Sequence, residues 1–140
     1  MGRIPRWSSP TARGHTLLST TSKQISGQLA EDSAQRHLQL HGLRLLCRNW
    51  TCRSGELDLV MLDGDTVVFV EVRYRRHAAW GGALESVDLR KQQKLIKAAQ
   101  LFLQKEPRWA RHPCRFDVVA IGATANASEK PNWIRNAFDS

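Results

Sequence analysis

Apolar residues recur along the chain with a helical spacing in two segments. In the first, small and apolar side chains return every three or four residues between Thr21 and Gly42, which predicts a helix with one buried side. Thr21 opens a Thr-x-x-Gln capping box, and Gly42 is a typical helix stop. The second helix is predicted to begin after a cap at Asp88 and to reach about Gln104. Its buried stripe consists of Leu95, Ile96, Ala99, Phe102 and Leu103.

Four other segments have the apolar pattern of β-strands. They cover residues 43–50, 56–62, 66–74 and 115–121. Asp63-Gly64 lies between the second and third segments and is a strong signal for a hairpin turn. The third segment is apolar on both strand faces, which is typical of a central strand covered on both sides. The tail is predicted to dock as a short helix through Trp133, Ile134, Ala137 and Phe138.

The predicted order of elements is α-β-β-β-α-β, which describes a single α/β domain with a mixed sheet flanked by helices. A chain of 140 residues with 41% apolar residues suffices for one core. Residues 1–20 are rich in Ser, Thr, Gly, Pro and Arg, so we expect a disordered basic arm before a domain at 21–140. No apolar run approaches the ~20 residues that span a bilayer. The three cysteines are odd in number and lack metal spacing, so we expect a cytoplasmic protein with reduced thiols and no membrane partner.

Charge is unevenly distributed along the chain. The 21 Lys and Arg residues outnumber the 13 Asp and Glu residues, which gives a net charge of +8. Residues 73–115 hold eleven basic residues and three acids, whereas residues 25–72 hold seven acids and four Arg. This distribution has two interpretations: a solvated surface without function, or a polyanion-binding half beside a carboxylate site that holds a cation.

Two acids of the predicted hairpin are candidates for that carboxylate site. Glu71 interrupts an apolar strand, and an unpaired buried carboxylate needs a cation or a proton. A turn at Asp63-Gly64 places Asp58 diagonal to Glu71, and a turn at Gly64-Asp65 places it directly opposite, at roughly 5–8 Å between Cβ atoms in either register. Such a pair can share a hard divalent cation such as Mg²⁺. The alternative is an ordinary ion pair of Glu71 with Arg73 or Arg48.

The two helices add further candidates. Glu31 lies on the apolar seam of the first helix, where it points towards the sheet or serves as a helix-edge acid. Gln92 extends the buried stripe of the second helix by one turn. A cationic stripe on that helix, which suits a phosphate backbone or simply a solvated face, consists of Arg90, Lys94 and Lys97 with Lys91 beside it.

Several strings in fixed order resemble the YraN family, small bacterial proteins predicted to be endonuclease-like. The strings are Ala30–Asp32, Gly55–Val60, Val68–Arg75, Arg90–Gln92 and Arg115–Ala120. The resemblance covers about residues 22–121, and we expect it to include the tail at Trp133–Phe138. The family is itself similar to the PD-(D/E)xK nuclease superfamily and to archaeal Holliday-junction resolvases, which implies a restriction-endonuclease-like sheet with a Mg²⁺ or Mn²⁺ site at its edge.

The resemblance assigns roles to particular residues. The implied catalytic set is Glu31, Asp58, Glu71, Arg73 and Gln92. The implied metal ligands are Glu31, Asp58, Glu71 and the backbone carbonyl of Val72. The residues expected to contact DNA phosphates are Arg75, Arg76, Arg90, Lys91, Lys94 and Lys97. Junction resolvases work as symmetric dimers, so a homodimer is a further expectation, although the sequence identifies no dimer face.

Arg73 departs from the superfamily pattern, which has Lys at this position. Arg can grip a phosphate with two hydrogen bonds, but it cannot act as a base near neutral pH. Two hypotheses therefore stay open: a metal-dependent DNA endonuclease in which a metal ion lowers the pKa of the attacking water, and a non-catalytic nucleic-acid-binding protein on a nuclease scaffold. A protein-interaction domain whose basic helix meets an acidic partner is a third.

Overall fold

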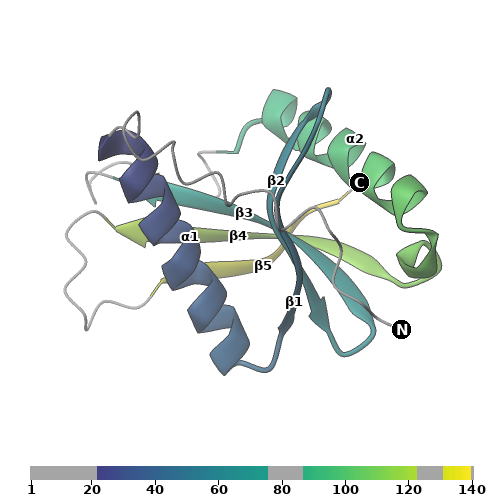
Figure 1. Cartoon of the computed structure of the whole chain (residues 1–140), viewed down its shortest axis with the longest axis horizontal. Helices are drawn as coiled ribbons and strands as arrows, with labels where there is room; N and C mark the ends of the chain where they lie inside the picture. The colour runs from purple at the N-terminus through teal and green to yellow at the C-terminus, as the bar shows by residue number, and fades with distance from the viewer. Residues whose placement is uncertain (1–21, 76–86, 123–130, 140) are drawn as a thin grey trace, which may run out of the picture.

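A five-stranded mixed sheet lies between two helices, one on each face (Figure 1). The computed structural model describes residues 22–75, 87–122 and 131–139. For residues 22–26 and 75 it describes the backbone alone. The strands stand in the order β1-β2-β3-β4-β5 across the sheet. Of the four strand pairings in the described residues, only that of β3 with β4 is parallel, and α2 lies between these two strands in the chain. The expected single α/β domain with a mixed sheet and flanking helices is confirmed.

Helix α1 (Ser22–Leu40) covers one face of the sheet with a seam of small and apolar side chains. Ala30, Ala34 and Leu38 are buried on this seam. The helix ends in a Schellman motif, in which the N–H of Leu43 donates to the carbonyl of Leu38 at 3.1 Å and the N–H of Gly42 donates to that of Gln39 at 3.0 Å. Gly42 has φ +94°, a conformation that side chains with a Cβ disfavour. The predicted stop at this glycine is confirmed.

Strands β1 (Arg44–Cys52), β2 (Gly55–Asp63) and β3 (Thr66–Arg75) form an antiparallel meander. Their bounds differ from the predicted segments by one or two residues. The pairing of Asp63 with Thr66 makes Gly64-Asp65 the two-residue turn, and Gly64 has φ +63° at its first position, as a type II′ turn requires. Of the two predicted registers, the second is therefore the one that forms.

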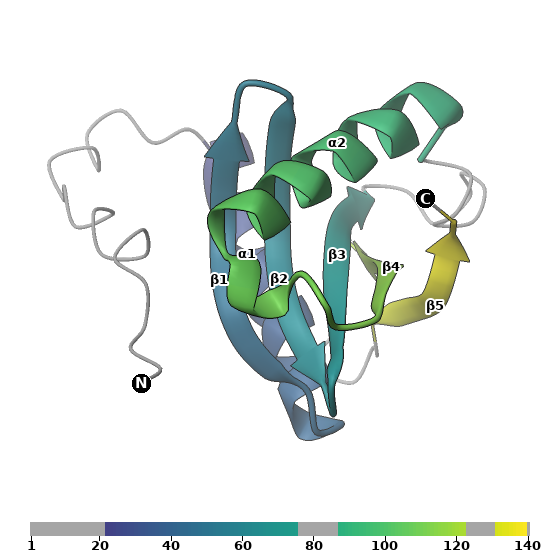
Figure 2. The same cartoon turned by 90° about the vertical axis from the view of Figure 1, so that its right-hand side faces the viewer.

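Helix α2 (Leu89–Lys105) covers the opposite face of the sheet (Figure 2). The carboxylate of Asp88 accepts a hydrogen bond from the N–H of Lys91 at 2.9 Å, so the predicted cap is confirmed. Phe102 is fully buried and makes edge-to-face contacts with Trp50 and Phe69, at 5.5 and 5.9 Å between ring centroids. A short 3-10 helix, η5 (Pro107–Trp109), then leads towards β4 (Cys114–Gly122).

The tail forms a fifth strand, β5 (Asn132–Phe138), antiparallel to β4, and the predicted short helix is wrong. Phe116 pairs with Phe138 and Val118 with Ile134, so one residue of β4 lies opposite three of β5. Asn136 has φ +50° within this bulge. The bulge places apolar residues in two adjacent pairs, 133–134 and 137–138, a spacing that imitates a helix.

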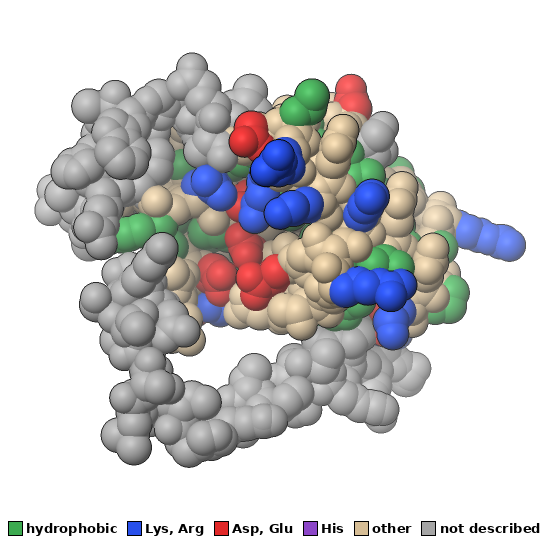
Figure 3. Space-filling view, turned by 90° about the horizontal axis from the view of Figure 1, so that it is seen from above, with side chains coloured by type: hydrophobic (Ala, Val, Ile, Leu, Met, Phe, Trp, Pro, Cys, Tyr) green, Lys and Arg blue, Asp and Glu red, His purple; other side chains and the backbone are tan. Residues whose placement is uncertain are grey.

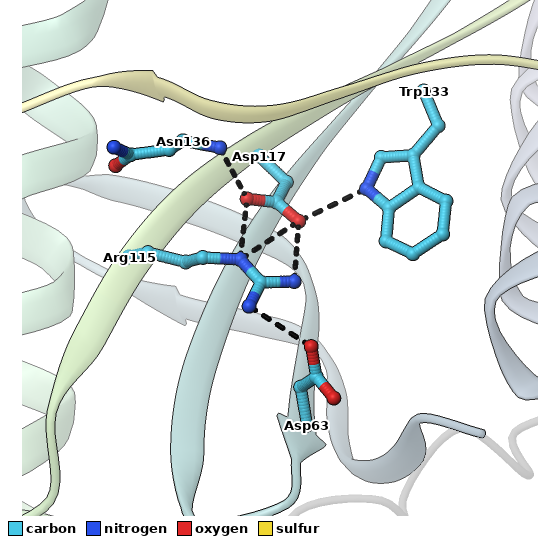
Figure 4. A network of polar contacts seen from close by, with 5 residues as sticks. All are labelled: Asp63, Arg115, Asp117, Trp133 and Asn136. Atoms are coloured by element: carbon cyan, nitrogen blue, oxygen red, sulfur yellow. Dashed lines mark hydrogen bonds and ion pairs between the residues drawn. The ribbon is translucent and has the colours of Figure 1, made fainter. Parts of the chain in front are cut away.

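A buried carboxylate secures this bulged strand (Figure 4). Asp117 is 0% exposed. It accepts hydrogen bonds from Nε of Arg115 at 3.0 Å, from Nε1 of Trp133 at 2.9 Å and from the backbone N–H of Asn136 at 2.9 Å. Arg115 also pairs with Asp63 at 2.9 Å, which links β4 to the β2–β3 turn. Because these partners all lie within the fold, the role of this carboxylate is structural.

Two expectations fall on residues outside the described ranges: the basic arm at 1–20 and Arg76 after β3. The domain boundary at residue 21 likewise stays a prediction. Neither α1 nor α2 is both long and apolar enough to cross a bilayer, and the same holds for every helix that the described ranges contain.

Candidate functional site

Asp58 and Glu71 meet where β2 and β3 lie side by side. The β2–β3 ladder begins at the pair Leu59 and Val70, and Asp58 and Glu71 are the next residues beyond that pair on their strands. The Asp58 carboxylate accepts a hydrogen bond from the backbone N–H of Val72 at 2.9 Å. The charge of Glu71 acts on Asp58, so the two carboxyl groups are neighbours, and their role as a site stays a prediction.

The side-chain alternation of β2 is interrupted at Asp58. Leu57 packs in the core under α2, whereas Leu59, two residues further, packs in the core under α1. In a regular strand these two side chains would share a face. Across the ladder on β1, Asn49 has φ +54°, a strained conformation that asparagine tolerates better than most residues. Asp58 thus lies at the point where the side-chain alternation of β2 shifts from one face of the sheet to the other. Acids from both faces of the sheet can therefore approach it.

Glu71 is nearly buried, with 5% of its side chain exposed, and two cations approach the same carboxylate oxygen. Nη1 of Arg73 donates to Oε2 at 3.0 Å. Nζ of Lys91, from the first turn of α2, lies 3.6 Å from that oxygen. The ordinary pair of Glu71 with Arg73 is therefore present, whereas Arg48 pairs with acids of α1 instead. These two cations are the partners that a buried carboxylate requires.

Asp58 is in a different position, because the pKa of its carboxyl group is raised to about 8 from an ordinary value of 3.8. Burial is the largest cause, and repulsion from Glu71 is the second. The charges of Glu31 and Glu56 add to the increase, whereas the hydrogen bond from Val72 opposes it. Asp58 is accordingly protonated in the folded protein at neutral pH when no further cation is bound.

Glu31 approaches the same cluster from α1. Burial raises the pKa of this carboxyl group, and a hydrogen bond from the side chain of Asn49 and the charge of Arg48 oppose the increase. Nη2 of Arg48 lies 3.5 Å from Glu31, and its Nη1 lies 2.7 Å from Asp32. Glu31 is thus partly buried towards the sheet and is also paired with Arg48 at the edge of the helix. Each of the two interpretations of Glu31, an acid that points towards the sheet and an acid at the helix edge, describes part of this environment.

The carboxylate oxygens of these acids are the type of ligand that hard cations bind, but they do not make a full set of ligands. In the described ranges, no three His, Cys, Asp or Glu side chains lie together as a metal site would require. The fit of a divalent cation rests on Asp58 and Glu71. Their donors are carboxylate oxygens, the ligands that Mg²⁺ and Mn²⁺ prefer. A cation beside Asp58 would favour its ionised form and offset the repulsion from Glu71, so the pair fits such an ion with water as its other ligands.

Lys and Arg side chains gather directly beside the acids on this end of the molecule (Figure 3). Arg90, Lys94 and Lys97 lie along helix α2, and all three are exposed. The predicted cationic stripe is thus present on the helix. Arg75 ends β3, but its side chain lies outside the described set. Nε2 of Gln92 donates to the carbonyl of Val87 at 3.0 Å, which braces the start of α2.

Two features of this site are not foreseen from the sequence, the ion pair of Lys91 and the conformation of Asn49. Lys91 is predicted to contact phosphate, and the structure places its ammonium group 3.6 Å from the Glu71 carboxylate. The sequence does carry a signal for the position of Lys91, because a cap at Asp88 places Lys91 in the first turn of the helix. Asn49 carries no such signal, since its positive φ cannot be read from a strand-like sequence.

The chain matches a family model and close relatives. The model described as "Uncharacterised protein family UPF0102" matches residues 30–121. A "UPF0102 protein" of Stutzerimonas stutzeri is 75% identical over 120 residues, which cover 86% of this chain and 99% of the relative. One of Pseudomonas fluorescens is 71% identical over 119 residues, covering 85% and 97%. One of Pseudomonas syringae pv. syringae is 62% identical over 120 residues, covering 86% and 98%. These names state a family and no activity.

Proposed function

We propose that this chain, which belongs to the UPF0102 family, also called YraN, is a metal-dependent phosphodiesterase that cleaves DNA. The observation that carries the proposal is the pair of half-buried Asp58 and buried Glu71 on adjacent central strands, with cations on the helix beside them. The resemblance to PD-(D/E)xK nucleases supports the same assignment.

In this proposal Asp58 and Glu71 hold a Mg²⁺ or Mn²⁺ ion, with the carbonyl of Val72 and the carboxylate of Glu31 as further oxygen donors. When bound there, such an ion would supply a water of lowered pKa and would neutralise charge on the phosphoryl group. Arg73 donates to the non-bridging phosphoryl oxygens, where negative charge grows in the transition state. Arg48 and Asn49 orient Glu31.

The stripe of Arg90, Lys94 and Lys97 contacts the phosphate backbone on either side of the reacting phosphodiester. Such contacts release counterions, so binding weakens as salt increases. They fix the position of the DNA without reading its sequence.

Cleavage of branched and linear DNA with Mg²⁺ or Mn²⁺ tests the proposal. We expect wild-type protein to cleave, Glu71→Ala to lose activity, and Asp65→Asn to retain it, because Asp65 is an exposed acid of the β2–β3 turn. Activity that survives Glu71→Ala would contradict the proposal.

A second candidate is non-catalytic nucleic-acid binding on the same scaffold, and Arg73 favours it because an arginine cannot serve as the base. It predicts salt-dependent DNA binding without cleavage of any substrate. Glu71→Ala should then leave binding intact or strengthen it, since it removes negative charge near the phosphates. Asp58→Ala should leave binding intact at neutral pH, because the Asp58 carboxyl group is protonated there. DNA affinity that is indifferent to salt would refute this candidate.

A further inference from the structure

The two cations at Glu71 differ in how firmly they are held. Arg73 lies two residues along the same strand and donates a hydrogen bond at 3.0 Å. The Nζ atom of Lys91 lies 3.6 Å from the same oxygen, beyond hydrogen-bond distance, and 40% of its side chain is exposed. A lysine ammonium is also strongly hydrated and carried on a flexible stem. Lys91 is therefore the more readily displaced of the two.

We propose that Lys91 is an exchangeable counter-ion for Glu71, which a divalent cation displaces and which then contacts a phosphate of the bound nucleic acid. The inference rests on the proposed function. Lys91 and a divalent cation at Asp58 and Glu71 would both need the charge of the same carboxylate. Like charges repel at such short separation, so binding of one disfavours binding of the other.

A displaced Lys91 side chain would lie on the exposed face of α2. The cap at Asp88 engages the backbone N–H of Lys91 and not its ammonium group, so the side chain can move without disturbing the helix start. Arg90 and Lys94, its neighbours on the first two turns, are exposed. The released ammonium group therefore joins a surface that is already cationic.

Displacement couples two binding events. In the absence of a divalent cation, Lys91 is partly neutralised by Glu71 and contributes little to phosphate binding. Once displaced, it adds a full positive charge to the surface that faces the nucleic acid. Divalent cation and nucleic acid should therefore strengthen each other's binding, and linkage requires the effect to be reciprocal.

Calorimetric titration of the full chain with Mn²⁺ tests the exchange. We expect Lys91→Gln to bind Mn²⁺ more tightly than wild type by about two- to fivefold, the effect of one partly exposed ion pair. Lys94→Gln removes the same charge from an exposed position on the same helix and should differ from wild type by less. Lys91→Arg keeps a cation near Glu71 and should remain close to wild type, which separates loss of charge from loss of structure.

DNA affinity supplies the second measurement, with Ca²⁺ as an oxygen-seeking cation added or omitted. Ca²⁺ should strengthen DNA binding by wild type more than by Lys91→Gln. The inference is overturned if Lys91→Gln binds Mn²⁺ no more tightly than wild type, or if Lys94→Gln changes as much. Wild-type protein that does not bind Mn²⁺ at all would instead overturn the proposed function, so the two failures are distinguishable.

Discussion

Replacement of Asp58 by Asn should stabilise the protein, and the gain should depend on pH. The substitution removes a carboxyl group whose pKa the fold raises from 3.8 to about 8. It keeps an oxygen that can accept the hydrogen bond from the N–H of Val72. Asp58→Asn therefore measures how much the negative charge of Asp58 lowers the free energy of unfolding.

The sign follows from proton binding in the two states. Between pH 4 and 8 the unfolded chain has lost the Asp58 proton while the folded protein retains it, so the unfolding free energy falls as pH rises. The decrease is complete above the folded pKa of about 8. At about 1.4 kcal/mol for each tenfold change in proton affinity, the full cost has an upper limit of roughly 6 kcal/mol. Structural relaxation and water entry reduce it, so we expect about 2–4 kcal/mol.

Urea denaturation followed by tryptophan fluorescence, in the presence of a chelator, measures this cost. The difference in unfolding free energy between Asp58→Asn and wild type should be near zero at pH 4 and should grow to its full value at pH 9. Asp65→Asn, on the exposed turn, serves as the control and should stay within about 0.5 kcal/mol of wild type. A difference that does not vary with pH, or an Asn variant that is less stable at pH 9, would refute the reasoning.

Three further predictions concern the frame of the site and its charged face. Asp117→Ala removes the acceptor shared by Arg115 and Trp133 and should destabilise the fold by about 3–5 kcal/mol, measured as a decrease in thermal stability; a decrease below about 1 kcal/mol would contradict it. Gly42→Ala, at φ +94°, should cost about 1 kcal/mol, whereas Gly27→Ala, inside α1 with open space around it, should add roughly 0.5–1 kcal/mol; denaturant midpoints that move in the same direction would refute this pair. The slope of log affinity for DNA against log salt should become shallower by about 0.9 for each phosphate that a variant no longer neutralises. It is measured in single Gln variants of Arg90, Lys94 and Lys97, and a slope equal to that of wild type in all three would contradict the assignment of the stripe.

Much of the scaffold could be predicted from local sequence. The cap at Asp88, the stop at Gly42 and the apolar segment of β3 each carry a signal within a few residues. The turn is ambiguous in the sequence because Asp63-Gly64 and Gly64-Asp65 are both acceptable turn pairs. Only the pairing of Asp63 with Thr66 decides between them, and it depends on which side chains the whole sheet buries.

The missed features depend on contacts between distant segments. Strand β5 is bulged, so its apolar residues do not alternate, and it forms because Asp117 of β4 supplies a buried acceptor for the backbone of Asn136. Asn49 sits in a left-handed conformation that only the pairing of β1 with β2 imposes. Lys91 lies 3.6 Å from Glu71 because the fold brings the first turn of α2 to β3, and the sequence alone does not fix that distance.

Paramagnetic broadening of backbone amide signals by Mn²⁺ tests most directly whether the carboxylate pair binds a divalent cation. At low Mn²⁺ concentration, the account predicts selective disappearance of the signals of Asp58, Glu71 and Val72, and their persistence in the double variant Asp58→Asn, Glu71→Gln. Broadening that centres elsewhere on the molecule, or that is the same in the double variant, would contradict it.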